Sequence, residues 1–315
     1  MTRLYLGIDG GQSSTKALLA DETGKVIGRG NGGPCNHAGS EEGRAKFLRA
    51  VGDCLRQAYH EAGVESHSLR FASVCLGLSG GSEDKEAFTR ELIASDRYKL
   101  THDAEIALLG GTAGEPGIII IAGTGSIAFG RNAKMQTARA GGWGYIFGDE
   151  GGGFDLARQA LRRALQYEEG WGSPTVLHKV LLEVSGIGSV NALLHHFYNH
   201  FDRTEIAMYA KLVTQAADQG DQAALEILQH AAHSLSGYVS GVYQQLFANK
   251  EVVPIVYVGG VFRSNTLLDL LRERVKSANQ CPLLTPHFSP VAGALLEALR
   301  QDGNLSPLSG LTPEE

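Results

Sequence analysis

Several features are scarce in this chain of 315 residues, and each absence excludes a class of protein. Its 28 Lys and Arg against 34 Asp and Glu leave a formal net charge of −6, and no dense basic run is present, so nucleic acid and an anionic membrane are poor candidate partners. No apolar run approaches the roughly 20 residues that span a bilayer, and the first residues lack a signal-peptide pattern. We therefore expect a cytoplasmic enzyme.

Cysteine is equally sparse. The four cysteines are Cys35, Cys54, Cys75 and Cys281. No pair has the spacing of a metal site or a redox motif, and the histidines lack a Cys or Glu partner at a useful distance. The pattern predicts free thiols in a reducing compartment. A histidine- or cysteine-ligated metal site is not expected.

Glycine, in contrast, is abundant: the chain has 41, about twice the average usage. Near the start an apolar run ends at Asp9, then Gly10 and Gly11 open a turn rich in hydroxyl groups, and Lys16 begins a second apolar run. Glycines let successive backbone N–H groups converge on an anion. A carboxylate at the strand end can hold a hydrated Mg²⁺. The pattern favours a phosphate-binding hairpin over an ordinary glycine hairpin, which remains the alternative.

The same pattern recurs about a hundred residues later. A strand at 117–122 meets a turn at 123–126 and a second strand at 127–130. A duplicated fold with two phosphate turns facing one cleft explains both halves, and the length predicts roughly two domains. Further elements are expected as a strand at 25–31, a helix at 41–62, a strand at 71–78, a helix reaching Ser95, a short strand through Leu100, a mainly helical region at 154–248, a strand at 255–258 followed by a helix from Ser264, and a helix at 289–300.

Three turns thus end apolar strands, at 9–16, 123–126 and 259–260. In this order they resemble the two phosphate loops and the adenosine loop of the actin-like ATPase superfamily. Within it the chain is similar to the N-acetylglucosamine kinases and their relatives, the group named after the BadF/BadG/BcrA/BcrD ATPases. The matching motifs are Asp9-Gly10-Gly11, Cys35-Asn36-His37, Leu78-Ser79-Gly80-Gly81, Thr101-His102-Asp103-Ala104, Ala122-Gly123-Thr124-Gly125-Ser126, the segment from Gly141 to Gly151 that contains Trp143, and Gln219-Gly220-Asp221.

This resemblance implies an α/β fold of two ribonuclease H-like domains with an active-site cleft between them. The expected domains are residues 1–114 with 290–304, and residues 115–289 with a helical insertion. The sequence departs from the family pattern in the first turn, where Gln12 replaces a third glycine and Ser13 replaces the usual threonine.

The resemblance also implies roles for individual residues. Asp103 would be the general base, with a helix N-cap as its alternative role. The sugar would contact Asn36, Thr124, Gly142, Trp143, Gly144 and Asp149. Trp143 could instead be a core residue, and Asp149 could instead close a salt bridge. ATP would contact Gly10, Gly11, Gln12, Ser13, Thr15, Lys16, Gly123, Thr124, Gly125, Gly220, Asp221, Gly259 and Gly260, and Asp9 would hold Mg²⁺ through water.

The resulting hypothesis is an ATP-dependent kinase for the 6-hydroxyl of N-acetylglucosamine. Glucosamine or another amino sugar is the closest alternative substrate. A non-kinase ATPase that drives electron transfer would need cysteine ligands for an iron–sulfur cluster, and no cysteine closely follows either phosphate turn. An ATP-switched binding module is the third alternative, and whether the protein forms a homodimer is left open.

Overall fold

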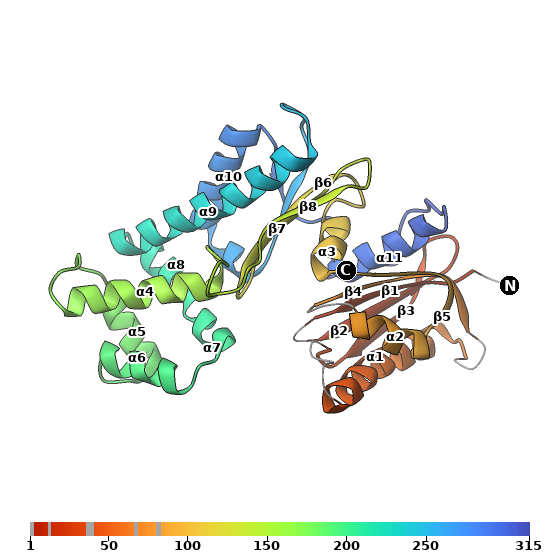
Figure 1. The fold of residues 1–315 in the computed structure, drawn as a ribbon, viewed down its shortest axis with the longest axis horizontal. Helices are drawn as coiled ribbons and strands as arrows, with labels where there is room; N and C mark the ends of the chain where they lie inside the picture. The colour runs from red at the N-terminus through yellow and green to blue at the C-terminus, as the bar shows by residue number, and fades with distance from the viewer. Residues whose placement is uncertain (1–2, 12–13, 36–40, 66–68, 80–82) are drawn as a thin grey trace. The chain divides into compact units, whose positions relative to one another are not determined.

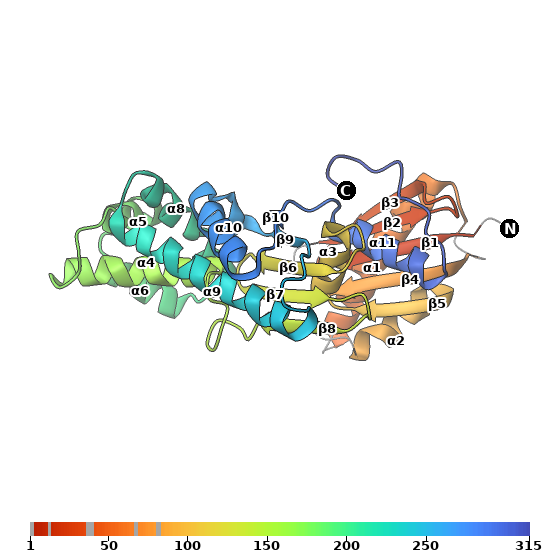
Figure 2. The same cartoon turned by 90° about the horizontal axis from the view of Figure 1, so that it is seen from above.

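A computed structural model describes residues 3–11, 14–35, 41–65, 69–79 and 83–315. The chain divides into two compact units, each shown in Figures 1 and 2. Unit 1 comprises Met1–Glu115 and Pro286–Glu315, and unit 2 comprises Pro116–Thr285. Among the described residues, no helix combines the length and the apolar character needed to cross a membrane.

Unit 1 is built on a five-stranded mixed sheet with the strand order β3-β2-β1-β4-β5. The strands are β1 (Tyr5–Gly10), β2 (Thr15–Ala20), β3 (Val26–Gly32), β4 (Arg70–Leu78) and β5 (Ala94–Thr101). The first three strands are antiparallel neighbours, while β4 runs parallel to β1 and β5 parallel to β4. Because the carboxyl ends of parallel strands meet at one edge, the residues that follow β1, β4 and β5 are brought together.

Helices cover both faces of this sheet. They are α1 (Glu41–Ala62), α2 (Glu83–Leu92), α3 (Asp103–Gly111) and α11 (Pro290–Gln301). Figure 1 shows α1 on one side of the sheet and α3 with α11 on the other. The helix α11 packs closely on α3 at Gly293, where a Cβ atom would lie 2.0 Å from the Ile106 carbonyl oxygen.

Unit 2 repeats the sheet. Its strands are β6 (Gly117–Ala122), β7 (Ser126–Arg131), β8 (Thr137–Gly141), β9 (Ile255–Val258) and β10 (Leu283–Leu284), in the order β10-β9-β6-β7-β8. The strands β6, β7 and β8 are antiparallel neighbours, and β9 and β10 add in parallel, as β4 and β5 do in unit 1. The predicted α/β fold with two ribonuclease H-like domains is confirmed.

The helices of unit 2 are α4 (Gly153–Glu168), α5 (Leu177–Ser185), α6 (Val190–Asn199), α7 (Arg203–Met208), α8 (Ala210–Asp218), α9 (Gln222–Leu246), the 3-10 helix η2 (Gly260–Arg263) and α10 (Asn265–Asn279). The long helix α9 packs on β6, β7 and β8, and α10 lies alongside it (Figure 1). The buried residues of α9, which include Ile227, Leu235 and Val242, recur at helical spacing and belong to one large apolar core.

Two sequence-based boundaries were wrong. The helix expected to reach Ser95 ends at Leu92, and β5 begins at Ala94. This strand lies at the edge of the sheet and is mostly exposed or half-buried, so it lacks the apolar signal of a buried strand. The strands β8 and β10 were not predicted at all, and both are also edge strands.

Candidate functional site

Two carboxylates and a serine gather at the strand-end edge of unit 1. Asp9 is the second-last residue of β1, Ser79 follows β4, and Asp103 begins α3 just after β5. The Ser79 hydroxyl donates to Asp103 Oδ2 over 2.6 Å. The Ser79 backbone N–H donates to the Gly10 carbonyl oxygen over 3.0 Å. These residues are far apart in the sequence, and the parallel pairing of β1, β4 and β5 brings them close together in space.

Asp103 is the first residue of its helix rather than the N-cap, a position that His102 occupies. Its Oδ1 atom accepts a hydrogen bond of 2.8 Å from the Ala104 backbone N–H. Together with the bond from Ser79 to Oδ2, this contact fixes the plane of the carboxylate. The carboxyl group is therefore oriented from both sides.

The neighbouring Asp9 has a raised pKa. Burial, and after it the negative charge of Asp103, raises the pKa of Asp9 to about 6, while Lys16 acts in the opposite direction. Two carboxylates this close repel each other when both are ionised. The pair is therefore a place where an additional positive charge would be stabilised.

Lys85 belongs to the same cluster, and sequence reasoning missed it. It lies on α2 with a deeply buried side chain, and its Nζ donates to the Ser79 carbonyl oxygen. Burial lowers the pKa of Lys85, and the charges of Cys35 and Asp103 act against this shift. A single lysine in a polar helix gives no sequence signal that its amine turns inward.

The first glycine turn is tightly packed. A Cβ atom on Gly10 would lie 2.3 Å from Leu78 Cδ2 and 2.5 Å from Cys35 Sγ. Gly11 donates its N–H to the Ser14 carbonyl oxygen over 2.9 Å. The hydroxyl of the buried Thr15 donates to the Gly33 carbonyl oxygen over 2.8 Å, so it serves the turn itself.

Lys16, the next residue, has an exposed side chain. The candidate ATP contacts Gln12 and Ser13 and the candidate sugar contact Asn36 lie outside the described residues.

The second glycine turn, in unit 2, is joined to the start of α4. Gly123 donates its N–H to the Gly125 carbonyl oxygen over 3.0 Å and accepts from Gly153 N–H over 2.7 Å. The Thr124 carbonyl oxygen accepts from Phe154 N–H over 3.0 Å. A Cβ atom on Gly125 would lie 2.4 Å from Asp149 Oδ2, so only glycine admits this carboxylate.

Asp149 is buried and forms an ion pair. Its backbone has a φ of 63°, in the left-handed region that is uncommon for residues other than glycine. Its Oδ2 atom accepts from Arg203 Nη2 over 3.0 Å. The salt bridge weighed as an alternative role for Asp149 is thus present. Because Arg203 lies on α7, far along the chain, sequence reasoning did not identify it.

The tryptophan segment is an exposed loop before α4. Gly142 and Gly144 flank Trp143 with φ values of 71° and 79°. The Trp143 side chain is 65% exposed, which excludes the alternative that it is a core residue. The Arg139 guanidinium lies 4.6 Å from its ring centroid. An aromatic ring held between flexible glycines is available to a ligand.

A cavity of about 560 Å³ opens beside the second turn in unit 2. It is lined by Gly123, Thr124, Gly153, Leu156, Thr204, Ala207, Met208, Ala210, Lys211, Thr214, Gln215, Gly260, Val261, Arg263 and Ser264. Mostly apolar walls with two cations at the rim suit a flat aromatic group that carries negative charge. Of the residues expected to contact ATP, Gly123, Thr124 and Gly260 line this cavity.

Gly220, Asp221 and Gly259, also candidate ATP residues, do not line it, and neither does Gly125. Gly259 has a φ of 127°, and a Cβ atom there would lie 2.1 Å from the Ala122 carbonyl oxygen. Gly220 precedes Asp221, whose carboxylate caps α9 by accepting from Ala224 N–H. The same carboxylate accepts from Val176 N–H over 2.7 Å. These contacts join α5 to α9, and an ATP contact at the three residues stays a prediction.

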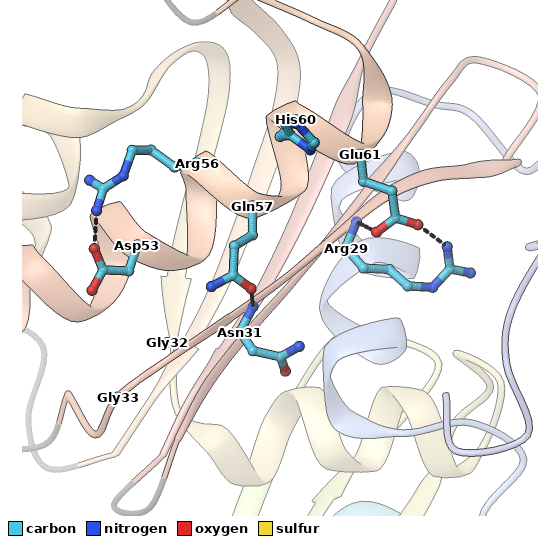
Figure 3. A pocket seen from close by; sticks show the side chains of 9 residues that line it. All are labelled: Arg29, Asn31, Gly32, Gly33, Asp53, Arg56, Gln57, His60 and Glu61. Carbon is cyan, nitrogen blue, oxygen red and sulfur yellow. Dashed lines mark hydrogen bonds and ion pairs between the residues drawn. The ribbon is translucent and has the colours of Figure 1, made fainter.

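A second hollow, of about 860 Å³, lies over β3 and α1 in unit 1 (Figure 3). Figure 3 shows its charged groups engaged with each other, Arg29 with Glu61 and Arg56 with Asp53. Gln57 and Glu61 accept hydrogen bonds from the backbone N–H groups of Asn31 and Arg29. The two arginines, the two acids and Gln57 of this hollow are thus engaged within the protein.

Comparison with known proteins adds to this geometry. The sequence profile described as the BadF/BadG/BcrA/BcrD ATPase family matches residues 6–298. An "N-acetylmuramic acid/N-acetylglucosamine kinase" of Clostridium acetobutylicum is 33% identical over 86% of this chain and 90% of its own length. An "N-acetyl-D-glucosamine kinase" of Dictyostelium discoideum is 30% identical over 94% of this chain and 98% of its own.

A solved structure is similar as well. A Chromobacterium violaceum protein described as a candidate N-acetylglucosamine kinase superposes with a TM-score of 0.75 and 28% identity. The superposition covers 93% of this chain and 98% of that one. The similarity therefore extends through both units.

Proposed function

Because the chain belongs to the BadF/BadG/BcrA/BcrD ATPase family, we propose that it is an ATP-dependent kinase that phosphorylates the 6-hydroxyl of N-acetylglucosamine. The names of the two relatives at 33% and 30% identity support this choice of substrate. The observation that carries the proposal is the Asp103 carboxylate, oriented by Ser79 at the strand-end edge of unit 1. Phosphoryl transfer depends on such positioning more than on covalent chemistry.

Asp103 acts as the general base in this proposal. The sugar 6-oxygen attacks the γ-phosphorus of ATP, its proton passes to the Asp103 carboxylate, and ADP leaves with the electron pair of the broken P–O bond. The bond from Ser79 to Oδ2 and the bond from Ala104 N–H to Oδ1 hold the carboxylate plane while this happens. A fixed base needs no reorganisation at the moment of transfer.

The sugar contacts are assigned to unit 2 and to Asn36. Asp149 and Thr124 supply polar groups next to the second turn. The backbone of Gly144 is open beside the exposed Trp143 ring, whereas Gly142 packs against Ile127. A monosaccharide presents several hydroxyls that both donate and accept, which suits a carboxylate and an amide. These roles are part of the proposal.

The nucleotide is assigned to the 560 Å³ cavity of unit 2, with its phosphates on the glycine turns. The backbone at Gly123–Gly125 would receive phosphate oxygens, as would Gly10 and Gly11 on unit 1. At Gly260 a Cβ atom would meet nothing within 4 Å, so the cavity wall is open there. Lys211 and Arg263 line the same cavity and would attract the triphosphate.

Asp9 fits a magnesium ion. Its half-buried carboxyl group interacts with the charge of Asp103, and the raised pKa of about 6 supports a site where added positive charge would be stabilised. Mg²⁺ is bound in proteins by one or two carboxylates together with water and substrate phosphates. When bound there through water, the ion would neutralise charge on the phosphates during transfer.

Release of ADP from ATP in the presence of Mg²⁺ tests the function directly. The panel of acceptors contains N-acetylglucosamine, N-acetylmuramic acid, glucosamine, N-acetylmannosamine and glucose. We expect the highest kcat/KM with N-acetylglucosamine and a product phosphorylated at its 6-oxygen. If no sugar in the panel stimulates ADP release, the kinase proposal is wrong.

Replacement of the base tests the mechanism. Asp103→Asn should remove at least about 99% of turnover, since general-base catalysis contributes about 10²–10⁴-fold, while ATP binding is retained. Asp96→Asn is the matched control, because Asp96 is an exposed carboxylate on β5 that pairs only with Arg70 among the described residues. Full turnover in Asp103→Asn would rule out the assigned base.

A further inference from the structure

We propose that Arg203 is a specificity-determining residue that makes the site prefer the uncharged N-acetyl group over a protonated amine on the sugar. The inference rests on the proposed function and concerns the same site. It addresses the choice between N-acetylglucosamine and glucosamine, which the sequence left open.

The Arg203 guanidinium is held in place from two directions. Its Nη2 atom donates to Asp149 Oδ2 over 3.0 Å. The guanidinium carbon lies 4.9 Å from the centroid of the Tyr145 ring. This ring packs in turn against Phe154 and Phe201, each with a centroid distance of 5.3 Å. A planar cation fixed by an ion pair and an aromatic face has little freedom to move away from a ligand.

The ion pair is positioned next to the proposed sugar contacts. Asp149 lies against the Gly125 backbone of the second turn, and Arg203 is the first residue of α7. The following residues of α7, Thr204, Ala207 and Met208, line the unit 2 cavity. The positive charge therefore lies beside the carboxylate assigned to the sugar, and the next residue of α7 lines the nucleotide cavity.

The pair sets the charge that a substrate meets. The Asp149 side chain is only 8% exposed, so its carboxylate interacts strongly with the guanidinium beside it. An incoming ammonium group would lose its hydration, find this carboxylate already neutralised, and face a like charge. An acetamido group brings no charge, and its carbonyl oxygen can accept a hydrogen bond from a guanidinium.

Asp149 is the acid that pairs with Arg203, and the other acids nearby make contacts of their own. Asp202 caps α7 by accepting from the N–H groups of Thr204 and Glu205. Glu205 Oε1 lies 3.8 Å from His196 Nε2, and Glu150 accepts a hydrogen bond from the hydroxyl of Tyr238. Within the part of the chain that the structure describes, Arg203 Nε is buried without a partner, so the guanidinium keeps unused donor capacity.

The test compares kcat/KM for N-acetylglucosamine and for glucosamine in three variants. In Arg203→Gln the ratio of the two should fall by at least about tenfold, because the repulsion of the ammonium is removed. In Arg203→Lys, which keeps the charge, the ratio should stay within about threefold of the wild-type value. Arg163→Gln is the matched control, since it breaks a unit 2 ion pair with Glu226 away from this site and should leave the ratio unchanged.

A measurement on the wild-type protein avoids any failure of a variant to fold. Glucose and glucosamine differ at one position by a hydroxyl or an ammonium group of similar size, so glucose should be turned over with the higher kcat/KM. Equal or faster turnover of glucosamine, or an unchanged ratio in Arg203→Gln, would overturn the inference. Failure of the proposed function is distinguishable, because then no sugar stimulates ADP release in the wild type.

Discussion

The hydroxyl of Ser79 lies 2.6 Å from Oδ2 of Asp103 and ties the end of β4 to the start of α3. The same serine is anchored at both of its backbone groups, its N–H on the Gly10 carbonyl oxygen and its carbonyl oxygen on Lys85 Nζ. The orientation of the carboxylate is therefore coupled to the first glycine turn and to α2. Ser79 thus contacts three other segments, α3 through its hydroxyl and the first glycine turn and α2 through its backbone.

Ser79→Ala removes the hydroxyl bond to Asp103 without adding bulk and leaves the two backbone bonds in place. We expect kcat to fall roughly 10- to 100-fold, which corresponds to about 1.5–3 kcal/mol for a hydrogen bond to a charged group. The KM for ATP should change little, because Ser79 is not assigned to the nucleotide. Steady-state kinetics with varied ATP and sugar measure both values.

Ser73→Ala provides the matched control for Ser79→Ala. Ser73 is a buried serine of the same strand, β4, and its hydroxyl has no hydrogen-bond partner among the described residues. Its loss should leave kcat unchanged. An equal loss of kcat in both variants would show that the effect comes from β4 packing rather than from the bond to Asp103.

Asp9→Asn should stabilise the folded protein at neutral pH while it weakens catalysis. The pKa of Asp9 is about 6 in the folded protein against 3.8 for an ordinary aspartate, so the folded state binds this proton more tightly than the unfolded chain. That contribution to stability is fully present below pH 3.8 and is lost as the pH rises through 6. Asparagine keeps the buried group neutral at every pH.

The measurement is urea unfolding of the metal-free protein at pH 5 and pH 8. The free energy of unfolding of Asp9→Asn relative to wild type should rise by about 1–2 kcal/mol between the two pH values. Asp96→Asn, which removes an exposed carboxylate, serves as the control. A constant difference for Asp9→Asn would show that Asp9 is not the group whose charge destabilises this edge of the sheet.

Gly293→Ala should destabilise unit 1. A Cβ atom at this position would lie 2.0 Å from the Ile106 carbonyl oxygen and 2.3 Å from the Gly110 nitrogen, both backbone atoms of α3. Forcing the helices apart should lower the free energy of unfolding by about 1–3 kcal/mol or more. Thermal unfolding followed by circular dichroism measures the change.

Gly52→Ala is the counterpart on α1. The nearest atom to a Cβ there is Arg56 Nη1, at 3.6 Å, which is an ordinary contact. Helix propensity alone should then raise stability by about 0.5–1 kcal/mol. The two substitutions should change the free energy of unfolding in opposite directions, and a destabilising Gly52→Ala would contradict this explanation.

Gly260→Leu should obstruct the proposed nucleotide cavity without harming the fold. Gly260 lines the cavity, and a Cβ atom there meets nothing within 4 Å. We expect the KM for ATP to rise at least about tenfold, which corresponds to ~1.4 kcal/mol of lost binding, with little change in the thermal midpoint. Gly188→Leu, in a loop where a Cβ also meets nothing within 4 Å, should leave the KM for ATP unchanged.

The sequence predicted the duplicated architecture because each copy begins with the same local signal. A buried apolar strand that ends in a glycine turn specifies β1 with β2, and again β6 with β7. The acids at the strand ends followed from the same reasoning. The local sequence pattern was sufficient to predict a strand wherever that strand was buried on both faces.

The remaining parts depend on tertiary contacts that no local pattern encodes. Arg203 meets Asp149 only because α7 folds back beside the second turn. Lys85 is inward-facing although α2 is mostly polar. At Asp221 the local pattern was ambiguous, because an aspartate before an apolar helix suits a ligand contact and an N-cap equally well. In the structure its carboxylate makes cap bonds.

The hollow over β3 and α1 has a consequence for assembly. An edge strand with free backbone N–H groups can recruit another chain as an additional strand. On β3 the outward N–H groups of Arg29 and Asn31 are already satisfied by Glu61 and Gln57, and the Val26 N–H by the Ser309 carbonyl oxygen. The protein thus seals this border with its own side chains and C-terminal segment, and a second copy that extended the sheet here would first have to displace them.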